Sequence, residues 1–159
     1  MIDHREGFMK LAIADAYRGC AKGDGGPFGA CVVRKGKVVA TAHNEVLRSK
    51  NPTLHAEIRA IGLASKRLGS HELSDCEIYS TTEPCPMCFS AIHWAKIKRV
   101  YFGTTIQDVK RLGFNELSIS NRAMKRLGSS PVELHAGICR SECSDLLKFW
   151  KKLPSRRTY

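Results

Sequence analysis

Two short stretches of this sequence carry one imidazole, two thiols and one carboxylate that can act together. His55 and Glu57 stand in the first stretch, and Cys85 and Cys88 stand in the second. A catalytic zinc ion usually takes three nitrogen or sulfur ligands and keeps a fourth position for water. His55, Cys85 and Cys88 meet this requirement and leave Glu57 free to move protons. The sequence therefore predicts a catalytic zinc centre.

Such a centre indicates hydrolysis at a carbon that bears an amino group. An open zinc position lowers the pKa of bound water to about 7 and so makes hydroxide available. Glu57 can take the proton of the water, pass it to a ring nitrogen and later protonate the departing ammonia. A closed structural zinc site would instead need a fourth Cys or His nearby, and the presence of Glu57 argues against it.

The spacing of His55 and Glu57 predicts that both stand at the start of a helix. Residues two apart point about 200° apart around a helix, so from its middle they cannot reach one ion. Residues 51–53 provide a turn and a cap, and apolar residues at helical spacing continue as far as Gly69. The N-terminal end of this helix should therefore point at the metal.

A second helix start is expected at the two cysteines. Cys85 and Cys88 are three residues apart and share one helical face, and residues 82–84 are expected to open their helix. The positive end of a helix dipole favours the thiolate, which is the form that binds zinc. Asn44, just after a predicted strand, can donate and accept hydrogen bonds to an amide-like base edge.

The hydrophobic pattern predicts an α/β fold around these helix starts. A mixed five-stranded sheet is expected between helices on both faces, in a single three-layer α/β/α domain of residues 1–159 that ends in a short tail, 153–159. Outside the two metal helices, the expected helices are 3–22, 107–113, 118–127 and 139–152. The expected strands are 28–34 and 37–43, which form a hairpin, then 77–80, 99–103 parallel to it, and 132–138.

The composition is ordinary for a soluble globular protein. The chain has 159 residues, 43% of them hydrophobic, and no apolar run approaches the ~20 residues of a membrane span. Seven cysteines are an odd number and two are assigned to zinc, so the others are expected to be free thiols in a reducing cytoplasm. The net charge of +11 raises the prospect of a nucleic-acid partner, but no cluster of Lys and Arg interleaved with aromatic residues accompanies it.

The predicted zinc centre resembles the cytidine deaminase superfamily, in the branch that holds guanine deaminases and tRNA adenosine deaminases. The shared pattern is His-x-Glu followed by Pro-Cys-x-x-Cys, the signature of zinc-dependent nucleobase deaminases. The resemblance covers about residues 26–114, including Pro27-Phe28-Gly29-Ala30 and Ala91-Ile92. It implies a cytidine-deaminase-like fold, a homodimer, and these roles: zinc ligands His55, Cys85 and Cys88, proton shuttle Glu57, and base ligand Asn44.

Four further residues resemble those of bacterial guanine deaminases: Phe28, Trp94, Glu116 and Tyr159. Phe28 is placed to stack on the base, and Trp94 follows the two cysteines. In guanine deaminases of this fold an acidic residue just after Gly-Phe recognises the base, and the C-terminal tail closes over the site. The acidic position is usually aspartate and falls here on Glu116, so a longer side chain must fit the same pocket.

The resemblance therefore implies hydrolytic deamination of a free purine base, guanine, at C2 to give xanthine and ammonia. A carboxylate at Glu116 suits guanine, because N1–H and the 2-amino group are both donors. Adenine presents an acceptor at N1, and a buried Glu116 facing it would be an unpaired charge.

Two alternative functions stay open from the sequence. A tRNA adenosine deaminase would explain the net charge of +11 and the pattern Gly137-Ile138…Glu142-Cys143, but the four residues that resemble guanine deaminases count against it. A non-catalytic zinc module that binds nucleic acid through its basic surface would need Glu57 to be dispensable and the fourth zinc position to be closed.

Overall fold

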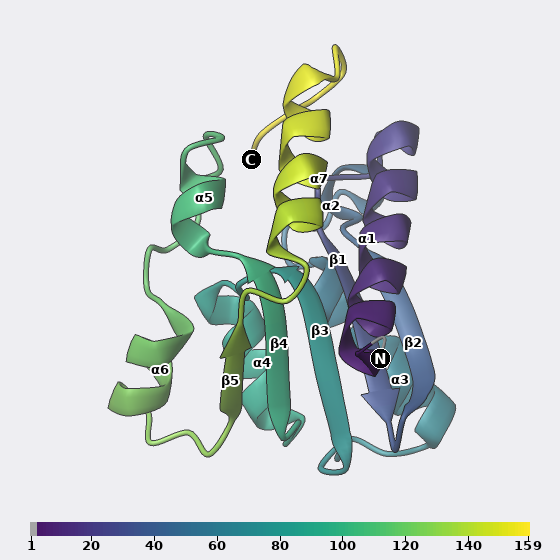
Figure 1. Ribbon diagram of the computed structural model, residues 1–159, viewed down its shortest axis with the longest axis vertical. Coiled ribbons are helices and arrows are strands. Elements are labelled where there is room, and N and C mark those ends of the chain that lie inside the picture. The colour runs from purple at the N-terminus through teal and green to yellow at the C-terminus, as the bar shows by residue number, and fades with distance from the viewer. Residues whose placement is uncertain (1–2) are drawn as a thin grey trace.

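The computed structural model describes residues 3–159 and has a five-stranded sheet at its centre (Figure 1). The strands lie in the order β2-β1-β3-β4-β5. Strand β1 is antiparallel to both of its neighbours, whereas β3, β4 and β5 are parallel to one another. Their bounds are β1 Gly29–Arg34, β2 Lys37–His43, β3 Cys76–Thr82, β4 Arg99–Thr104 and β5 Glu133–Ala136. The sheet is mixed, as predicted.

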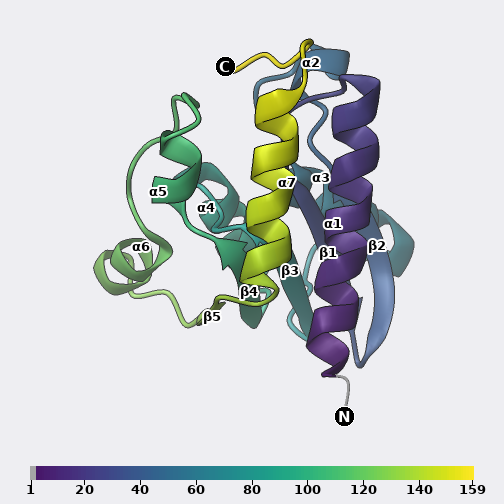
Figure 2. The same cartoon turned by 45° about the horizontal axis from the view of Figure 1, so that its top comes forward.

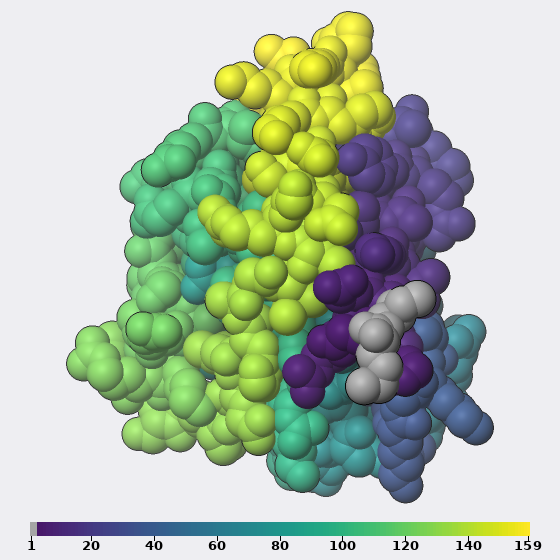
Figure 3. Space-filling model, viewed as in Figure 1, coloured from purple at the N-terminus to yellow at the C-terminus, as the bar shows by residue number. Residues whose placement is uncertain are grey.

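Helices cover both faces of this sheet (Figures 1 and 2). Helices α1 (His4–Lys22) and α7 (Arg140–Lys152) lie side by side on one face, and α3 (Ala56–Leu68) and α4 (Pro86–Trp94) lie on the other. Figure 3 looks onto the α1 and α7 face, with the C-terminal tail at the top. The short helices are α2 (Val46–Ser49), α5 (Ile106–Lys110) and α6 (Asn121–Leu127). The predicted α/β/α architecture is confirmed.

Local sequence explains where the hairpin turns and where α3 ends. Lys35 and Gly36 have positive φ angles of 49° and 72°, as a two-residue turn between antiparallel strands requires. Gly69 ends α3 in the left-handed conformation, with φ at 63°, which glycine adopts at little cost. Both boundaries agree with the sequence-based predictions.

Several other boundaries differ from the predictions. The cysteine helix starts at Pro86 rather than at residues 82–84, because β3 continues to Thr82. Proline suits this first helical position, where its missing N–H loses no hydrogen bond. Helix α2, a single turn between β2 and α3, was not predicted, and α6 starts only at Asn121 because Ser120 caps it.

No helix of the described residues is long and apolar enough to cross a membrane.

Candidate active site

A helix starts at each of the two metal-ligand stretches, although the one at the cysteines starts later than predicted. His55 is the N-cap residue of α3, and Cys85 is the N-cap residue of α4. Cys88 lies in the first turn of α4. Strand β3 ends at Thr82 and leads into α4 at the carboxyl edge of the parallel strands, where α/β sheets place their sites. The fold therefore places the three ligand residues at the N-terminal ends of two helices, α3 and α4.

The three side chains are arranged as ligands of one ion. His55 Nδ1 lies 3.6 Å from Cys85 Sγ and 3.5 Å from Cys88 Sγ. A tetrahedral zinc ion with nitrogen at about 2.0 Å and sulfur at about 2.3 Å separates two such ligands by about 3.5 Å. The distances and the donor types therefore fit zinc.

The cysteine pair can carry negative charge before any metal binds. The neighbouring Cys88 thiol holds the pKa of Cys85 well below its usual range, and His55 adds to this effect against the opposing effect of burial. The pKa of Cys88 is raised, first by Cys85 and then by burial. One thiolate is thus available to bind a cation.

Glu57 is buried beside this group, in the first turn of α3. Ser80 Oγ, from β3, lies 2.8 Å from Glu57 Oε1 and 2.6 Å from the carbonyl oxygen of Thr82. Burial raises the pKa of Glu57, and the charge of Cys85 raises it further. A buried carboxyl with a raised pKa is suited to exchange protons near neutral pH. The sequence did not predict Ser80, because one serine in a strand carries no distinctive signal.

A pocket of about 300 Å³ opens beside the ligand group. His55 and Cys85 form part of its wall, and Glu116 and Tyr159 form another part. The other lining residues are mainly apolar: Val46, Pro52, Pro86, Met87, Phe114, Asn115 and Leu117. Its volume is at the lower end of the range for small-molecule sites. Four of the predicted site residues therefore meet at one cavity.

Asn44 and Phe28 are buried against residues that line this pocket. Asn44 N–H donates to the Phe28 carbonyl oxygen at 3.1 Å, and the Phe28 ring packs edge-on against Phe114, with ring centroids 5.1 Å apart. Asn44 Oδ1 accepts a hydrogen bond from the Val46 N–H at 3.1 Å. Asn44 Nδ2 is buried and has no hydrogen-bond partner within residues 3–159. The donor that Asn44 keeps free is therefore Nδ2.

Glu116 lines the pocket and carries an unpaired carboxylate oxygen. Its Oε2 is buried and has no hydrogen-bond partner among the described residues. Burial raises the pKa of Glu116 to about 7, with the charges of Cys85 and Glu57 adding to the shift. A buried acceptor without a partner is costly unless a ligand supplies a donor. The position suits a ligand with N–H groups.

The C-terminal residue closes one side of the pocket of its own chain. The Gly26 N–H donates to Tyr159 Oη at 3.3 Å, and the Asn115 N–H donates to the Tyr159 carbonyl oxygen at 3.2 Å. The Tyr159 ring packs edge-on against Phe114, with ring centroids 5.2 Å apart. Burial raises the pKa of the Tyr159 hydroxyl. The tail is thus anchored at its last residue.

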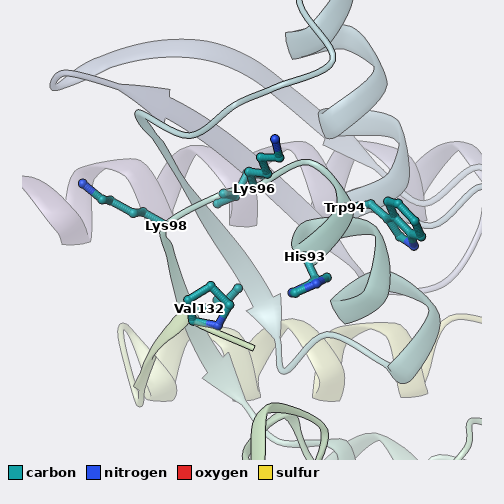
Figure 4. Close-up of a pocket in the computed structure, with 7 residues that line it drawn as sticks. His93, Trp94, Lys96, Lys98 and Val132 are labelled. Atoms are coloured by element: carbon teal, nitrogen blue, oxygen red, sulfur yellow. The ribbon is translucent and has the colours of Figure 1, made fainter. Parts of the chain in front are cut away.

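Trp94 does not lie in this pocket. It stands at the C-terminal end of α4, away from Cys85, and its side chain is 82% exposed. It lines a separate pocket of about 500 Å³ with His93, Lys96, Ile97, Lys98, Pro131 and Val132 (Figure 4). Nine residues of helix rise about 13 Å, so Trp94 is remote from the ligand group of its own chain. Its predicted contact with the base is not formed within one chain.

Glu83, expected from the sequence only to open the cysteine helix, is a buried residue near the site with contacts that the sequence did not predict. Its carboxylate accepts hydrogen bonds from the Asn121 N–H at 2.8 Å and the Ile106 N–H at 3.2 Å. Asn121 Nδ2 in turn donates to the Pro84 carbonyl oxygen at 2.6 Å. These bonds tie the starts of α5 and α6 to the segment before Cys85. Backbone partners of this kind leave no pattern in a sequence.

The chain belongs to a family of zinc-binding deaminases. The model of the cytidine and deoxycytidylate deaminase zinc-binding region matches residues 2–104. The chain is 35% identical to a guanine deaminase of Bacillus subtilis over 156 residues, which cover 98% of this chain and 99% of that relative. It is also 35% identical to a tRNA-specific adenosine deaminase of Agrobacterium fabrum over 144 residues, 91% of each chain.

A solved structure shares the fold closely and contains a purine analogue. This crystal structure of a variant protein in complex with 8-azaguanine has a TM-score of 0.84 and 29% sequence identity to the chain. The match covers 92% of this chain and 84% of that one. The deaminase family and its fold, which the sequence motifs predicted, are therefore confirmed.

Proposed function

We propose that the protein is a guanine deaminase that hydrolyses guanine to xanthine and ammonia. The observation that carries this proposal is the buried, unpaired carboxylate oxygen of Glu116 in the pocket that His55 and Cys85 also line. Similarity along almost the whole chain to a guanine deaminase supports it. A related structure that holds a guanine analogue supports it as well.

We assign His55, Cys85 and Cys88 as the ligands of a zinc ion. When bound, zinc activates water as the nucleophile of the hydrolysis. Three protein ligands are the number found at catalytic zinc sites, which keep one position for water. The low pKa of Cys85 supports this assignment, because zinc binds the thiolate.

Glu57 moves the protons of the reaction. Its carboxylate takes a proton from water and delivers it to a ring nitrogen of the base. It then takes the hydroxyl proton of the tetrahedral adduct at C2 and passes it to the amino group, so that C2=O forms as ammonia leaves. Ser80 Oγ lies 2.8 Å from Oε1 and holds this carboxylate in place beside the ligand group. The raised pKa of Glu57 suits both steps, because the group must gain and lose a proton in each turnover.

Glu116 and Asn44 recognise opposite kinds of group on the base. The Glu116 carboxylate accepts hydrogen bonds from N1–H and the 2-amino group of guanine, which satisfies its unpaired oxygen. Asn44 Nδ2 donates to an acceptor of the base. Phe28 and Phe114 supply the aromatic wall on which the ring stacks. Adenine has no donor at N1 and would leave Glu116 unsatisfied.

Residues 153–159 complete the site as the last part of a single deaminase domain. The Tyr159 ring and its two hydrogen bonds hold the tail over one wall of the pocket. The tail therefore acts as a cover that limits access of bulk water to the base. A covered pocket of about 300 Å³ suits a free base better than a nucleotide within RNA.

The active protein is a homodimer in which the Trp94 face is the interface. Trp94 and Leu127 are large apolar side chains with exposed fractions of 82% and 73%, and their helices α4 and α6 pack against each other. Such a concentration of exposed apolar surface is typical of an interaction site. The second chain is also the means by which Trp94 reaches a substrate pocket.

Ammonia release from purified, zinc-loaded protein tests the proposed reaction. Guanine, adenine, cytosine, cytidine, guanosine and an anticodon stem-loop with adenosine at position 34 are compared at equal concentration. Turnover of guanine alone is expected. Turnover of the stem-loop alone would replace the proposal by tRNA adenosine deamination, which the net charge of +11 would then explain.

A further inference from the structure

A second buried cluster of titratable groups surrounds His43, the residue before Asn44. His43 Nδ1 lies 3.1 Å from Asp15 Oδ1, and His43 Nε2 lies 2.8 Å from Asp24 Oδ2. All three side chains are buried. The imidazole also packs directly on α1 at Gly19, where a Cβ atom would overlap the ring. The ring is thus clamped between the helix and the loop that follows it.

Both ring nitrogens of His43 face a carboxylate oxygen. A neutral imidazole has a single N–H, so one of its nitrogens would point a lone pair at an anion. The protonated ring donates on both sides and forms two charge-assisted hydrogen bonds. In agreement, Asp15 raises the pKa of His43 and Asp24 adds to the shift, whereas burial opposes it.

The charges around the ring balance without a metal ion. They come from α1, the loop after it, the start of α2, and α3: Asp15, Asp24, Glu45, Arg18, Arg48 and Arg59. Asp24, His43 and Glu45 have the composition of a metal site. The arginines already lie against all three carboxylates, however, and the protonated ring supplies further positive charge. The cluster is therefore complete as a network of ion pairs.

This network is connected to the part of the pocket that we assign to base recognition. The Asp24 carbonyl oxygen accepts hydrogen bonds from the Leu47 and Arg48 N–H groups at 3.1 and 3.0 Å, which ties the loop to α2. A Cβ atom at Gly25, the next residue, would overlap the side chain of Asn44. One at Gly26 would overlap the ring of Phe28. The loop that contacts His43 therefore packs directly against the side chains of Asn44 and Phe28.

We propose that His43 is a positioning residue: as an imidazolium ion between Asp15 and Asp24, it fixes the loop at residues 24–28 and so sets the place of Asn44 and Phe28 in the pocket. This inference rests on the proposed function, because its effect is read on guanine. Loss of the proton breaks one of the two hydrogen bonds and weakens the link between the loop and α1, leaving the backbone bond from the Asp24 N–H to the Gly19 carbonyl oxygen. Base binding then weakens, while Glu57 and the zinc ligands are left in place.

The sign of the pH effect follows from the direction of the shift. Because the pKa of folded His43 is raised, the network is intact at low pH and is lost as the pH rises through that pKa. The KM for guanine should therefore increase at high pH, with a smaller change in kcat. In His43→Gln the KM should be raised about tenfold at all pH values, because the single amide nitrogen can replace only one of the two ring nitrogens and the amide oxygen cannot donate to the other carboxylate.

The experiment combines nitrogen NMR of the ring with kinetics on the zinc-loaded protein. At about pH 7 both His43 nitrogens should carry protons, as identified by comparison with His43→Gln. Asp15→Asn leaves the ring in place and should lower the pH at which the KM of guanine rises. His71→Gln changes a histidine whose side chain is 93% exposed and should behave as the unaltered protein.

A neutral His43 tautomer at about pH 7, or an unchanged KM profile in Asp15→Asn, would overturn the proposal. Zinc bound in excess of one ion per chain, and lost in His43→Gln, would overturn it in favour of a second metal site. The NMR result needs no turnover. It can therefore be told apart from a failure of the guanine deaminase assignment. That failure would appear as no activity of the unaltered protein on guanine.

Discussion

The two sides of the pocket are constructed differently. The reaction side consists of His55, Glu57, Cys85 and Cys88, which all lie at the cap or in the first turn of α3 or α4. The recognition side draws on four separate segments: the loop before β1, the residue after β2, the loop after α5 and the C-terminal tail. Helix starts fix the first side by local geometry, whereas loops and a tail fix the second by long-range contacts.

This difference indicates which side sets the chemistry and which sets the substrate. A ligand group on two packed helices is rigid, and each ligand's place follows from its spacing along the helix. Loops and termini vary more readily and are where binding specificity concentrates. Changes on the reaction side should therefore abolish turnover of any base, and changes on the recognition side should alter which base is bound.

The largest effect is expected from Glu57→Gln. Removal of the proton shuttle should reduce kcat by about 10²–10⁴-fold, while the zinc content and the fold stay unchanged. Kinetics together with metal analysis measure both quantities. Glu142→Gln, at an exposed position on α7, is the matched control. Ammonia release at the original rate would show that Glu57 takes no part in the mechanism. It would also contradict the assignment of the chemistry to the reaction side of the pocket.

The next largest effect is expected from Glu116→Gln. The amide loses the charged acceptor for guanine, so kcat/KM should fall by about 10²-fold with zinc retained. The pKa of Glu116 is raised to about 7, so in the unaltered protein the carboxylate form is lost as the pH falls through that value and the KM should rise. This rise should be missing in Glu116→Gln. A variant with an unchanged KM profile would show that Glu116 does not bind the base.

A smaller effect is expected from removal of the tail. Deletion of residues 153–159 removes the Tyr159 contacts with Gly26 and Asn115 and should lower kcat/KM for guanine by about tenfold, with the zinc content unchanged. Tyr159→Phe keeps the ring and should lower kcat/KM by less than the deletion does. Full activity of the truncated protein would mean that the tail is no cover and that the recognition side is smaller than proposed.

The smallest effect on one chain's own site is expected from Trp94→Ala. The change should shift the protein from dimer to monomer in sedimentation, because it removes the most exposed aromatic side chain of the proposed interface. Leu11→Ala is the control, since Leu11 is 45% exposed on α1, on the other side of the sheet. If the unaltered protein is already a monomer, the Trp94 face is not a dimer interface. Trp94 then has no route to a substrate pocket and no part in base recognition.

The same contrast explains how much could be predicted from the sequence. The hairpin turn at Gly36 and the helix end at Gly69 follow from local backbone preferences, and the zinc ligands follow from spacing at helix starts. Trp94 was placed at the base by resemblance alone, and its helical position shows that it does not line the pocket of its own chain. Nine residues beyond Cys85 it lies about half a turn around the helix as well as at the far end.

Residues that act through long-range contacts could not be predicted. Ser80 reaches Glu57 across the interface between β3 and α3, and the acids that clamp His43 lie up to 28 residues away in the sequence. Nothing in the spacing of such residues marks them. Leu11 is a related case, because it is a large apolar residue of a packed helix, α1, and yet is 45% exposed. Packing at a single position depends on the neighbours that the fold brings.

Direct binding to the zinc-loaded Glu57→Gln protein tests the central claim most directly, because binding is then separated from turnover. Calorimetric titration with guanine and, in parallel, with the adenosine-34 anticodon stem-loop measures which ligand the recognition side accepts. We expect one guanine bound per chain and no detectable binding of the stem-loop. Binding of the stem-loop without guanine would contradict the account, since the pocket formed by Glu116, Asn44 and Tyr159 would then serve a nucleotide within RNA.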